Sequence, residues 1–225
     1  MPRLLSLVSL MLFALAQPAV PQAQPRILVM GDSMMASHTL SGRAIPHVLA
    51  KRLKTPVSSR AVTGARIIYN LPITGAMGLS IPQQFRPGEW DWVVLNGGGN
   101  DLWLGCGCHK CDRKMDRLIS DSGLKGQIPS LVAKIRKTGA KVLYVGYLRS
   151  PGANSPIESC KDDGDILEQR ISTLARKIKG VYFLSNKDLV PEGDRSYHGL
   201  DMIHPSIKGS NAIGTRIARF IADTD

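Results

Sequence analysis

Short apolar segments alternate with longer amphipathic segments along most of this chain of 225 residues. The short segments are nearly continuous runs of apolar side chains, which is typical of β-strands that are buried on both faces. The expected strands cover Arg26–Met30, Val57–Val62, Trp92–Leu95, Lys141–Tyr147 and Val181–Leu184. The expected helices cover Gly42–Leu53, Gly126–Lys137, Asp165–Lys179 and Ile207–Ile221. This alternation predicts one α/β domain built on a parallel sheet of about five strands, with helices on both faces.

The composition excludes several classes of protein but does not by itself identify a function. With 43% hydrophobic and 21% charged residues and a mean hydropathy of -0.05, the chain is neither disordered nor a coiled coil. The net charge of +11 is typical of nucleic-acid or membrane-surface binding, but it is spread along the chain without a run of five or six like charges. We therefore expect no nucleic-acid partner and, at most, weak association with an anionic envelope surface, and the oligomeric state stays open.

The N-terminal residues have the pattern of an export signal. One positive charge at Arg3 precedes an apolar run over Leu4–Ala16, which is too short for a membrane span and ends in small residues. We predict that residues 1–23 are a secretory signal peptide and leader, cleaved after Ala16 or after Ala23, and that residues 24–225 form a single domain. The predicted location is periplasmic or secreted.

Export makes the four cysteines interpretable, because an even number in an oxidising compartment favours disulfides. The cysteines are Cys106, Cys108, Cys111 and Cys160. A bridge from Cys106 to Cys108 would close a very tight loop, so two pairings are favoured. In these, Cys160 joins Cys106 or Cys108, and Cys111 takes the other. The alternatives are a zinc site that includes His109 and a redox-active pair, but the pattern favours disulfides and predicts neither a metal nor a cofactor.

Reactive side chains follow the predicted strands and precede the last predicted helix, where the crevice of such a sheet lies. Ser33 directly follows the first strand, and Asp201 and His204 precede the last helix. A serine hydroxyl is a weak nucleophile unless a base lies within hydrogen-bond reach. The spacing predicts Ser33 as nucleophile, His204 as its base and Asp201 as the group that orients the imidazole.

Acyl transfer by a serine also needs hydrogen-bond donors for the oxyanion of the tetrahedral intermediate. The candidates are the Ser33 amide, the Gly64 amide and the side chain of Asn100. Trp103, shortly after Asn100, is a candidate for the wall of the substrate site. Asp32 is expected to cap a helix or turn, and Asp101 to make a local structural hydrogen bond.

Four sequence blocks together resemble the SGNH (GDSL-type) hydrolases. The blocks are Gly31-Asp32-Ser33, Thr63-Gly64-Ala65, Gly98-x-Asn100-Asp101 and Asp201-x-x-His204, in that order over roughly residues 26 to 220. The resemblance implies a three-layer α/β/α flavodoxin-like fold and metal-free hydrolysis of carboxylic esters or thioesters through an acyl-Ser33 intermediate. It also implies the roles given above for Ser33, His204, Asp201, Gly64 and Asn100. Two features depart from the family pattern: Met34 where Leu is usual, and the cysteine-containing insertion after Asn100.

The resemblance leaves the substrate open among small-molecule esters, acylated carbohydrates and lipids. An alternative is a non-catalytic module that retains the hydrolase fold and binds carbohydrate or the cell envelope. A decayed enzyme would be expected to lack one member of the triad, whereas the sequence keeps Ser33, Asp201 and His204. The enzyme hypothesis is therefore favoured.

Overall fold

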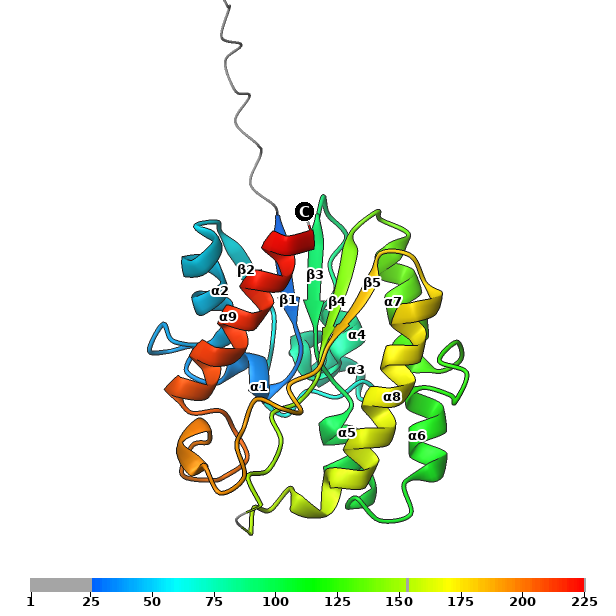
Figure 1. Cartoon of the computed structure of the whole chain (residues 1–225). Helices are drawn as coiled ribbons and strands as arrows, with labels where there is room; N and C mark the ends of the chain where they lie inside the picture. Colours follow the sequence, from blue (N-terminus) through cyan, green and yellow to red (C-terminus); the bar gives the residue numbers. More distant parts are fainter. Residues whose placement is uncertain (1–25, 153, 225) are drawn as a thin grey trace, which may run out of the picture.

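A computed structural model describes residues 26–152 and 154–224, so the predicted signal peptide and leader lie outside the described residues. The fold is a sheet of five parallel strands in the order β2-β1-β3-β4-β5 (Figure 1). The strands are β1 (Ile27–Met30), β2 (Val57–Ser59), β3 (Trp92–Leu95), β4 (Lys141–Val145) and β5 (Val181–Leu184). The predicted α/β class and the five-stranded parallel sheet are confirmed.

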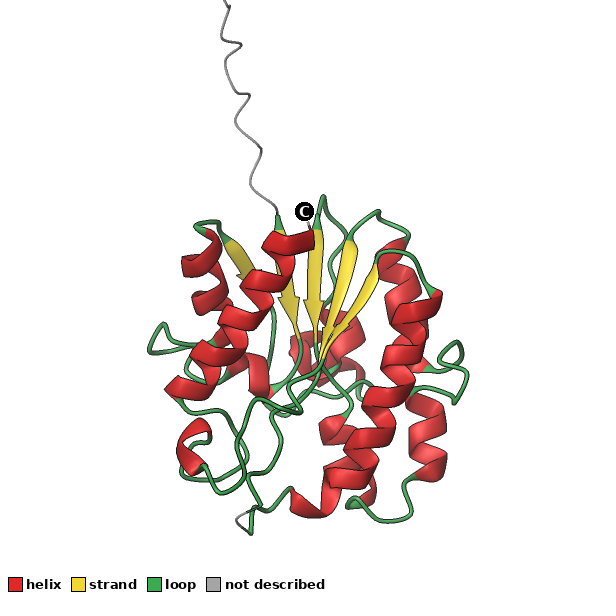
Figure 2. Cartoon of the chain, viewed as in Figure 1, coloured by secondary structure: helices red, strands yellow, loops and turns green. Residues whose placement is uncertain are grey.

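Helices cover both faces of the sheet (Figures 1 and 2). The long ones are α2 (Ile45–Leu53), α7 (Gln127–Arg136), α8 (Lys161–Lys177) and α9 (Ile207–Thr224). Shorter helices, most of them near the carboxyl ends of the strands, are α1 (Ser33–Ala36), α3 (Pro72–Thr74), α4 (Ile81–Gln84), α5 (Gly99–Cys106) and α6 (Asp112–Leu118). None of the helices in the described part of the chain has both the length and the hydropathy of a membrane span.

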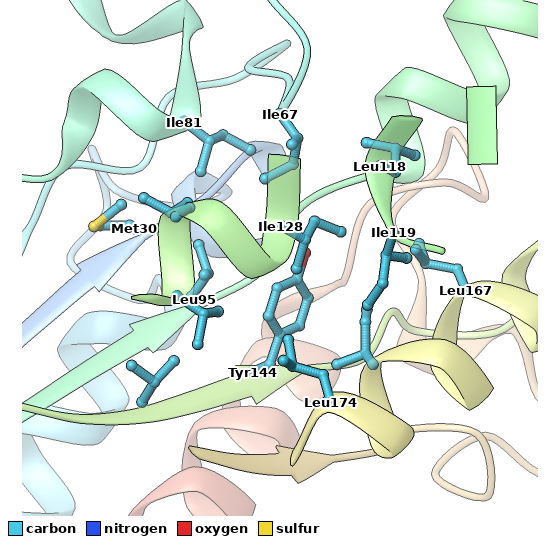
Figure 3. Packing of buried hydrophobic residues seen from close by; sticks show 14 of the residues in the cluster. Met30, Ile67, Ile81, Leu95, Leu118, Ile119, Ile128, Tyr144, Leu167 and Leu174 are labelled. Carbon is cyan, nitrogen blue, oxygen red and sulfur yellow. The ribbon is translucent and has the colours of Figure 1, made fainter. Parts of the chain in front are cut away.

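Alternation along each strand divides the core into two clusters, because successive side chains point to opposite faces. On one face, Ile27 and Val29 of β1 pack against apolar residues of α2 and α9. On the other, Leu28 and Met30 belong to a cluster that includes residues of α7 and α8. Figure 3 shows this second cluster, which also contains Tyr144 of β4. The result is the three-layer arrangement that the resemblance implied.

Several predicted boundaries are wrong by a few residues, for local reasons. The expected strand 57–62 ends at Ser59, because β2 is an edge strand that pairs only with β1 and its last two residues are exposed. The expected strand 141–147 ends at Val145, and the helix expected from Asp165 already begins at Lys161. The interior Gly164 disfavours a helix in the sequence but is tolerated in the structure.

The order of the strands determines where the loops meet. The chain leaves β1 to form β2 on one side and then crosses back to β3 on the other side. In doubly wound sheets, ligands bind in the crevice outside the carboxyl ends of the strands at this reversal. Figure 2 shows the loops gathered beyond the arrowheads of the strands, and the predicted site residues lie on these loops and on the helices that follow them.

Candidate active site

Ser33 is the first residue of α1, directly after the end of β1. The preceding Asp32 caps this helix, because its carboxylate accepts a hydrogen bond from the Met34 amide at 3.0 Å. The expectation that Asp32 acts as a cap is therefore confirmed. Gly31 leaves the strand with φ +149°, and a Cβ there would lie 1.7 Å from the side chain of Asn96. Glycine is thus required for the close approach that turns the chain toward Ser33.

The Asp32 carboxylate is almost completely buried, at 1% exposure, and it is the centre of a hydrogen-bond network. It accepts from Asn96 Nδ2 at 2.9 Å and from the hydroxyl of Tyr147. The Tyr147 hydroxyl in turn accepts from the amide of Gly99 at 3.0 Å. Burial raises the pKa of Asp32 more than these hydrogen bonds and the charge of His204 lower it.

His204 and Asp201 form the contact that the sequence predicts. The Nδ1 atom of His204 lies 2.5 Å from a carboxylate oxygen of Asp201, and the other oxygen accepts from the amides of Ile203 and His204 at 3.0 and 3.1 Å. Desolvation alone would raise the pKa of Asp201, but these hydrogen bonds outweigh it and lower that pKa. The carboxylate thus stays ionised and holds the imidazole in one orientation.

Three contacts outside this pair hold the loop that carries His204. The Gly199 amide donates to the His204 carbonyl at 2.8 Å, and His38 Nε2 donates to the carbonyl of Pro205 at 2.9 Å. The hydroxyl of Ser155 donates to the carbonyl of Met202 at 2.7 Å. The loop is therefore fixed from the chain after α1 and from the segment before α8.

Ser33 and His204 line the same cavity, which has a volume of about 550 Å³. In the described part of the chain the Ser33 hydroxyl makes no hydrogen bond to His204. Such contacts are often long before substrate binds, so the arrangement is compatible with transfer of a proton between the two side chains. Both Asp201 and His204 are partly exposed, with side-chain exposures of 46% and 33%, so solvent screens their contact and it contributes little to folding stability.

The three predicted oxyanion donors differ in how much the structure supports them. The Ser33 amide lies at the start of α1, where a helix leaves its first amides unpaired. Gly64 has φ +79°, and its amide has no acceptor among the described residues. The side chain of Asn100 lines the cavity and donates to the carbonyl of Ala65 at 3.0 Å. This contact connects the Asn100 and Gly64 blocks.

Asp101 is buried, but its predicted local hydrogen bond is wrong. Its two carboxylate oxygens accept from the amides of Ile67 and Ile68, 34 and 33 residues away, at 2.9 and 2.8 Å. Burial raises the pKa of Asp101 to about 6, although these amides partly oppose the shift. Asp101 thus attaches the segment after Gly64 to α5, which places Asn100.

All four cysteines are in disulfides, Cys106 with Cys111 and Cys108 with Cys160. This is the second of the two favoured pairings. Since the sulfur atoms are paired, they do not form the alternative zinc site, and no cluster of His, Cys, Asp and Glu suited to a metal occurs among the described residues.

Sequence reasoning missed Tyr147 and Asn96 as residues of the site. Tyr147 was predicted to end a strand, but it lies two residues beyond β4 and lines the cavity. The rule that sites lie at the carboxyl ends of strands was the available signal. The prediction that Trp103 lines the site agrees with the cavity. His198, the other histidine near the proposed triad, is buried, and its ring nitrogens have no hydrogen-bond partner within residues 26–152 and 154–224.

Comparison with known proteins identifies the class. Residues 29–212 match the model of the GDSL-like lipase/acylhydrolase family. The chain belongs to this family, and it is a hydrolase that acts on ester bonds. No curated protein matches the sequence.

Solved structures share the fold at low sequence identity. A proposed SGNH hydrolase from Slackia heliotrinireducens is 19% identical with a TM-score of 0.63, and the match covers 88% of this chain and 100% of that one. A family two carbohydrate esterase from Clostridium thermocellum, solved in complex with cellohexaose, is 18% identical with a TM-score of 0.58, covering 92% and 66%. TesA is 20% identical with a TM-score of 0.57, covering 88% and 97%. These likenesses support the three-layer fold of the SGNH hydrolases.

Proposed function

We propose that this protein is an exported serine esterase that hydrolyses carboxylic esters or thioesters through an acyl-Ser33 intermediate. The observation that carries the proposal is the position of His204, which is oriented by Asp201 at 2.5 Å and lines the same cavity as Ser33. Membership in the GDSL-like lipase/acylhydrolase family supports the same chemistry.

In the first half of the reaction, Ser33 Oγ attacks the carbonyl carbon of the ester while His204 Nε2 accepts the hydroxyl proton. Asp201 stabilises the imidazolium through its contact with Nδ1. The negative charge on the carbonyl oxygen is held by the amides of Ser33 and Gly64 and by Asn100 Nδ2. The bond to the leaving oxygen or sulfur then breaks, and His204 returns the proton to the departing alcohol or thiol.

In the second half, water attacks the acyl-Ser33 carbonyl. His204 accepts a proton from this water and then donates it to Ser33 Oγ as the carboxylic acid leaves. Both halves therefore use the same base, the same oxyanion donors and no metal or organic cofactor.

The family and the structural neighbours indicate the chemical class of the substrate. We propose a small-molecule ester or an acylated carbohydrate or lipid, because the neighbours include carbohydrate esterases. We also propose that residues 24–225 form one domain that acts in the periplasm or outside the cell. The two disulfides support this location, since such bonds persist in oxidising compartments.

The direct test is hydrolysis of p-nitrophenyl acetate by the wild type and by Ser33→Ala. We expect Ser33→Ala to lower kcat by about 10⁴-fold or more, because loss of a triad nucleophile removes the covalent route. Ser41→Ala is the matched control, since the hydroxyl of this exposed serine donates to the carbonyl of His38 and Ser41 does not line the cavity. Equal rates for the wild type and Ser33→Ala would contradict the proposal and favour a non-catalytic binding module.

A further inference from the structure

The cavity beside Ser33 has an outer wall that does not belong to any of the four sequence blocks. This wall, residues 154–160, lies between β4 and α8. Its side chains Ile157, Glu158 and Cys160 line the cavity together with Leu102 and Trp103 of α5. The shape of the cavity therefore depends on where the wall is held.

Two contacts hold the wall, one on each side of the proposed site. The disulfide between Cys108 and Cys160, with a Cα–Cα distance of 4.9 Å, attaches it to the turn after α5. The buried hydrogen bond from Ser155 Oγ to the carbonyl of Met202 attaches it to the loop of His204. The wall thus bridges the helix that bears Asn100 and the loop that bears the proposed base.

Much of the lining of the cavity is apolar. The apolar lining residues come from separate segments of the chain and include Met34, Leu102, Trp103, Leu148, Ile157 and Leu167. Charged side chains also reach the cavity, but Arg149, Lys161 and Lys187 each lie within 4 Å of the carboxylate of Asp165. Arg149 also contacts Glu168, and Glu158, Asp188 and Glu192 line the cavity as well, so the lining has no excess of positive charge for an anionic substrate group.

An acetyl group would fill only a small part of a cavity of about 550 Å³. The apolar chain of an acyl group carried on Ser33 Oγ would instead displace water from the apolar lining, which favours binding in proportion to the buried area.

We infer that the Cys108–Cys160 disulfide holds the wall as one side of an acyl-chain site, so that the protein prefers esters of medium-length apolar acids to acetyl esters. This inference rests on the proposed function, because it assumes that the acyl group is transferred to Ser33. It adds the class of acyl group and assigns its selection to a disulfide outside the triad.

The test compares kcat/KM for p-nitrophenyl acetate, butyrate and octanoate. For the wild type we expect a rise of up to roughly fourfold for each methylene that becomes buried. Removing the disulfide in the double variant Cys108→Ser, Cys160→Ser should lower kcat/KM for the octanoate at least tenfold, mainly through KM. The value for the acetate should change less than twofold.

The matched control is the double variant Cys106→Ser, Cys111→Ser. It removes the other disulfide, whose cysteines are only five residues apart and do not line the cavity. We expect this control to keep the wild-type dependence on chain length. If the variant without the Cys108–Cys160 bond does not fold, Ile157→Ala replaces it and should lower kcat/KM for the octanoate severalfold without affecting the acetate.

Two results would overturn the inference. One is a wild-type enzyme that hydrolyses the octanoate no faster than the acetate, and the other is a chain-length dependence that both disulfide variants leave unchanged. Failure of the proposed function has a different signature, because Ser33→Ala would then retain hydrolysis of all three esters.

Discussion

The hydroxyl of Tyr147 connects the segment that carries Ser33 with the segment that carries Asn100, so its removal tests how the proposed site is held together. It donates to the buried carboxylate of Asp32, next to Ser33, and accepts from the amide of Gly99, next to Asn100. The substitution Tyr147→Phe keeps the ring and removes only this hydroxyl. The Asp32 carboxylate and the Gly99 amide would each lose one hydrogen-bond partner.

The magnitude follows from the burial of the two groups. A buried polar group that loses its partner costs about 1–3 kcal/mol. Asp32 keeps the hydrogen bonds from Asn96 and Met34, and Gly99 is half-buried, where water can replace the lost partner. We therefore expect the free energy of unfolding to fall by about 1–2 kcal/mol. If about 1.4 kcal/mol of this loss also applies to the transition state, kcat of Tyr147→Phe falls about tenfold.

The assay combines urea unfolding at pH 7 with kcat and KM for a p-nitrophenyl ester. The control is Tyr144→Phe, because the Tyr144 hydroxyl is also buried and donates to the carbonyl of Gly97 at 2.9 Å. We expect both variants to lose stability, but only Tyr147→Phe to lose kcat, with KM nearly unchanged. The reasoning is refuted if Tyr147→Phe keeps the wild-type kcat, or if Tyr144→Phe lowers kcat to the same extent.

Three further predictions test other contacts of the site. Asp201→Asn should lower kcat by about 10³- to 10⁴-fold, because the asparagine side chain neither fixes the His204 tautomer nor stabilises the imidazolium. A loss of kcat below tenfold in steady-state kinetics would contradict this. Asn100→Ala should lower kcat by about 10²- to 10³-fold with little change in KM, as expected for an oxyanion donor, whereas a change in KM alone would assign Asn100 to substrate binding. Asp101, with its pKa raised from 3.8 to about 6, binds a proton more tightly in the folded state. The proton bound by folded Asp101 stabilises the wild type at low pH, and this stability is lost as the pH rises through about 6. Between pH 4 and pH 6 the wild type should therefore lose about 2 kcal/mol of stability relative to Asp101→Asn, and a pH-independent difference in urea unfolding would refute this.

The parts of the fold that the sequence predicts are those dominated by hydrophobic burial. The predicted and observed bounds of β1, β3 and β5 agree within one residue; β1 and β3 are fully buried, and β5 is partly buried. The long helices α7 and α9 have apolar residues at helical spacing and are also found, with their ends shifted by at most three residues. In these elements, burial of one face determines both the type of structure and its place in the chain.

Short helices near the site were not predicted, because their backbone depends on contacts that are distant in sequence. Gly97, Gly98 and Gly99 give no helical signal, yet α5 begins at Gly99 and carries Asn100. The Asp101 carboxylate accepts hydrogen bonds from amides 33 and 34 residues away, and these contacts cannot be recognised from the sequence.

The candidate site was predicted from residue type and position at strand ends, and the structure brings Ser33, Asn100 and His204 to one cavity. The sequence could not predict the contacts that hold these residues. These are the hydrogen bonds of the Tyr147 hydroxyl and the two attachments of the wall, residues 154–160. A tyrosine after a strand and a loop with one cysteine have many structural roles, so neither pattern is specific.

The central claim is that Ser33 carries the acyl group, and covalent labelling tests it most directly. The protein is incubated with a fluorophosphonate ester, a reagent that phosphonylates activated serines, and its mass is measured before and after proteolysis. We expect one adduct per chain, located on Ser33, with loss of esterase activity in proportion to labelling and no adduct in Ser33→Ala. An adduct on another residue, or full inactivation without modification of Ser33, would contradict the account.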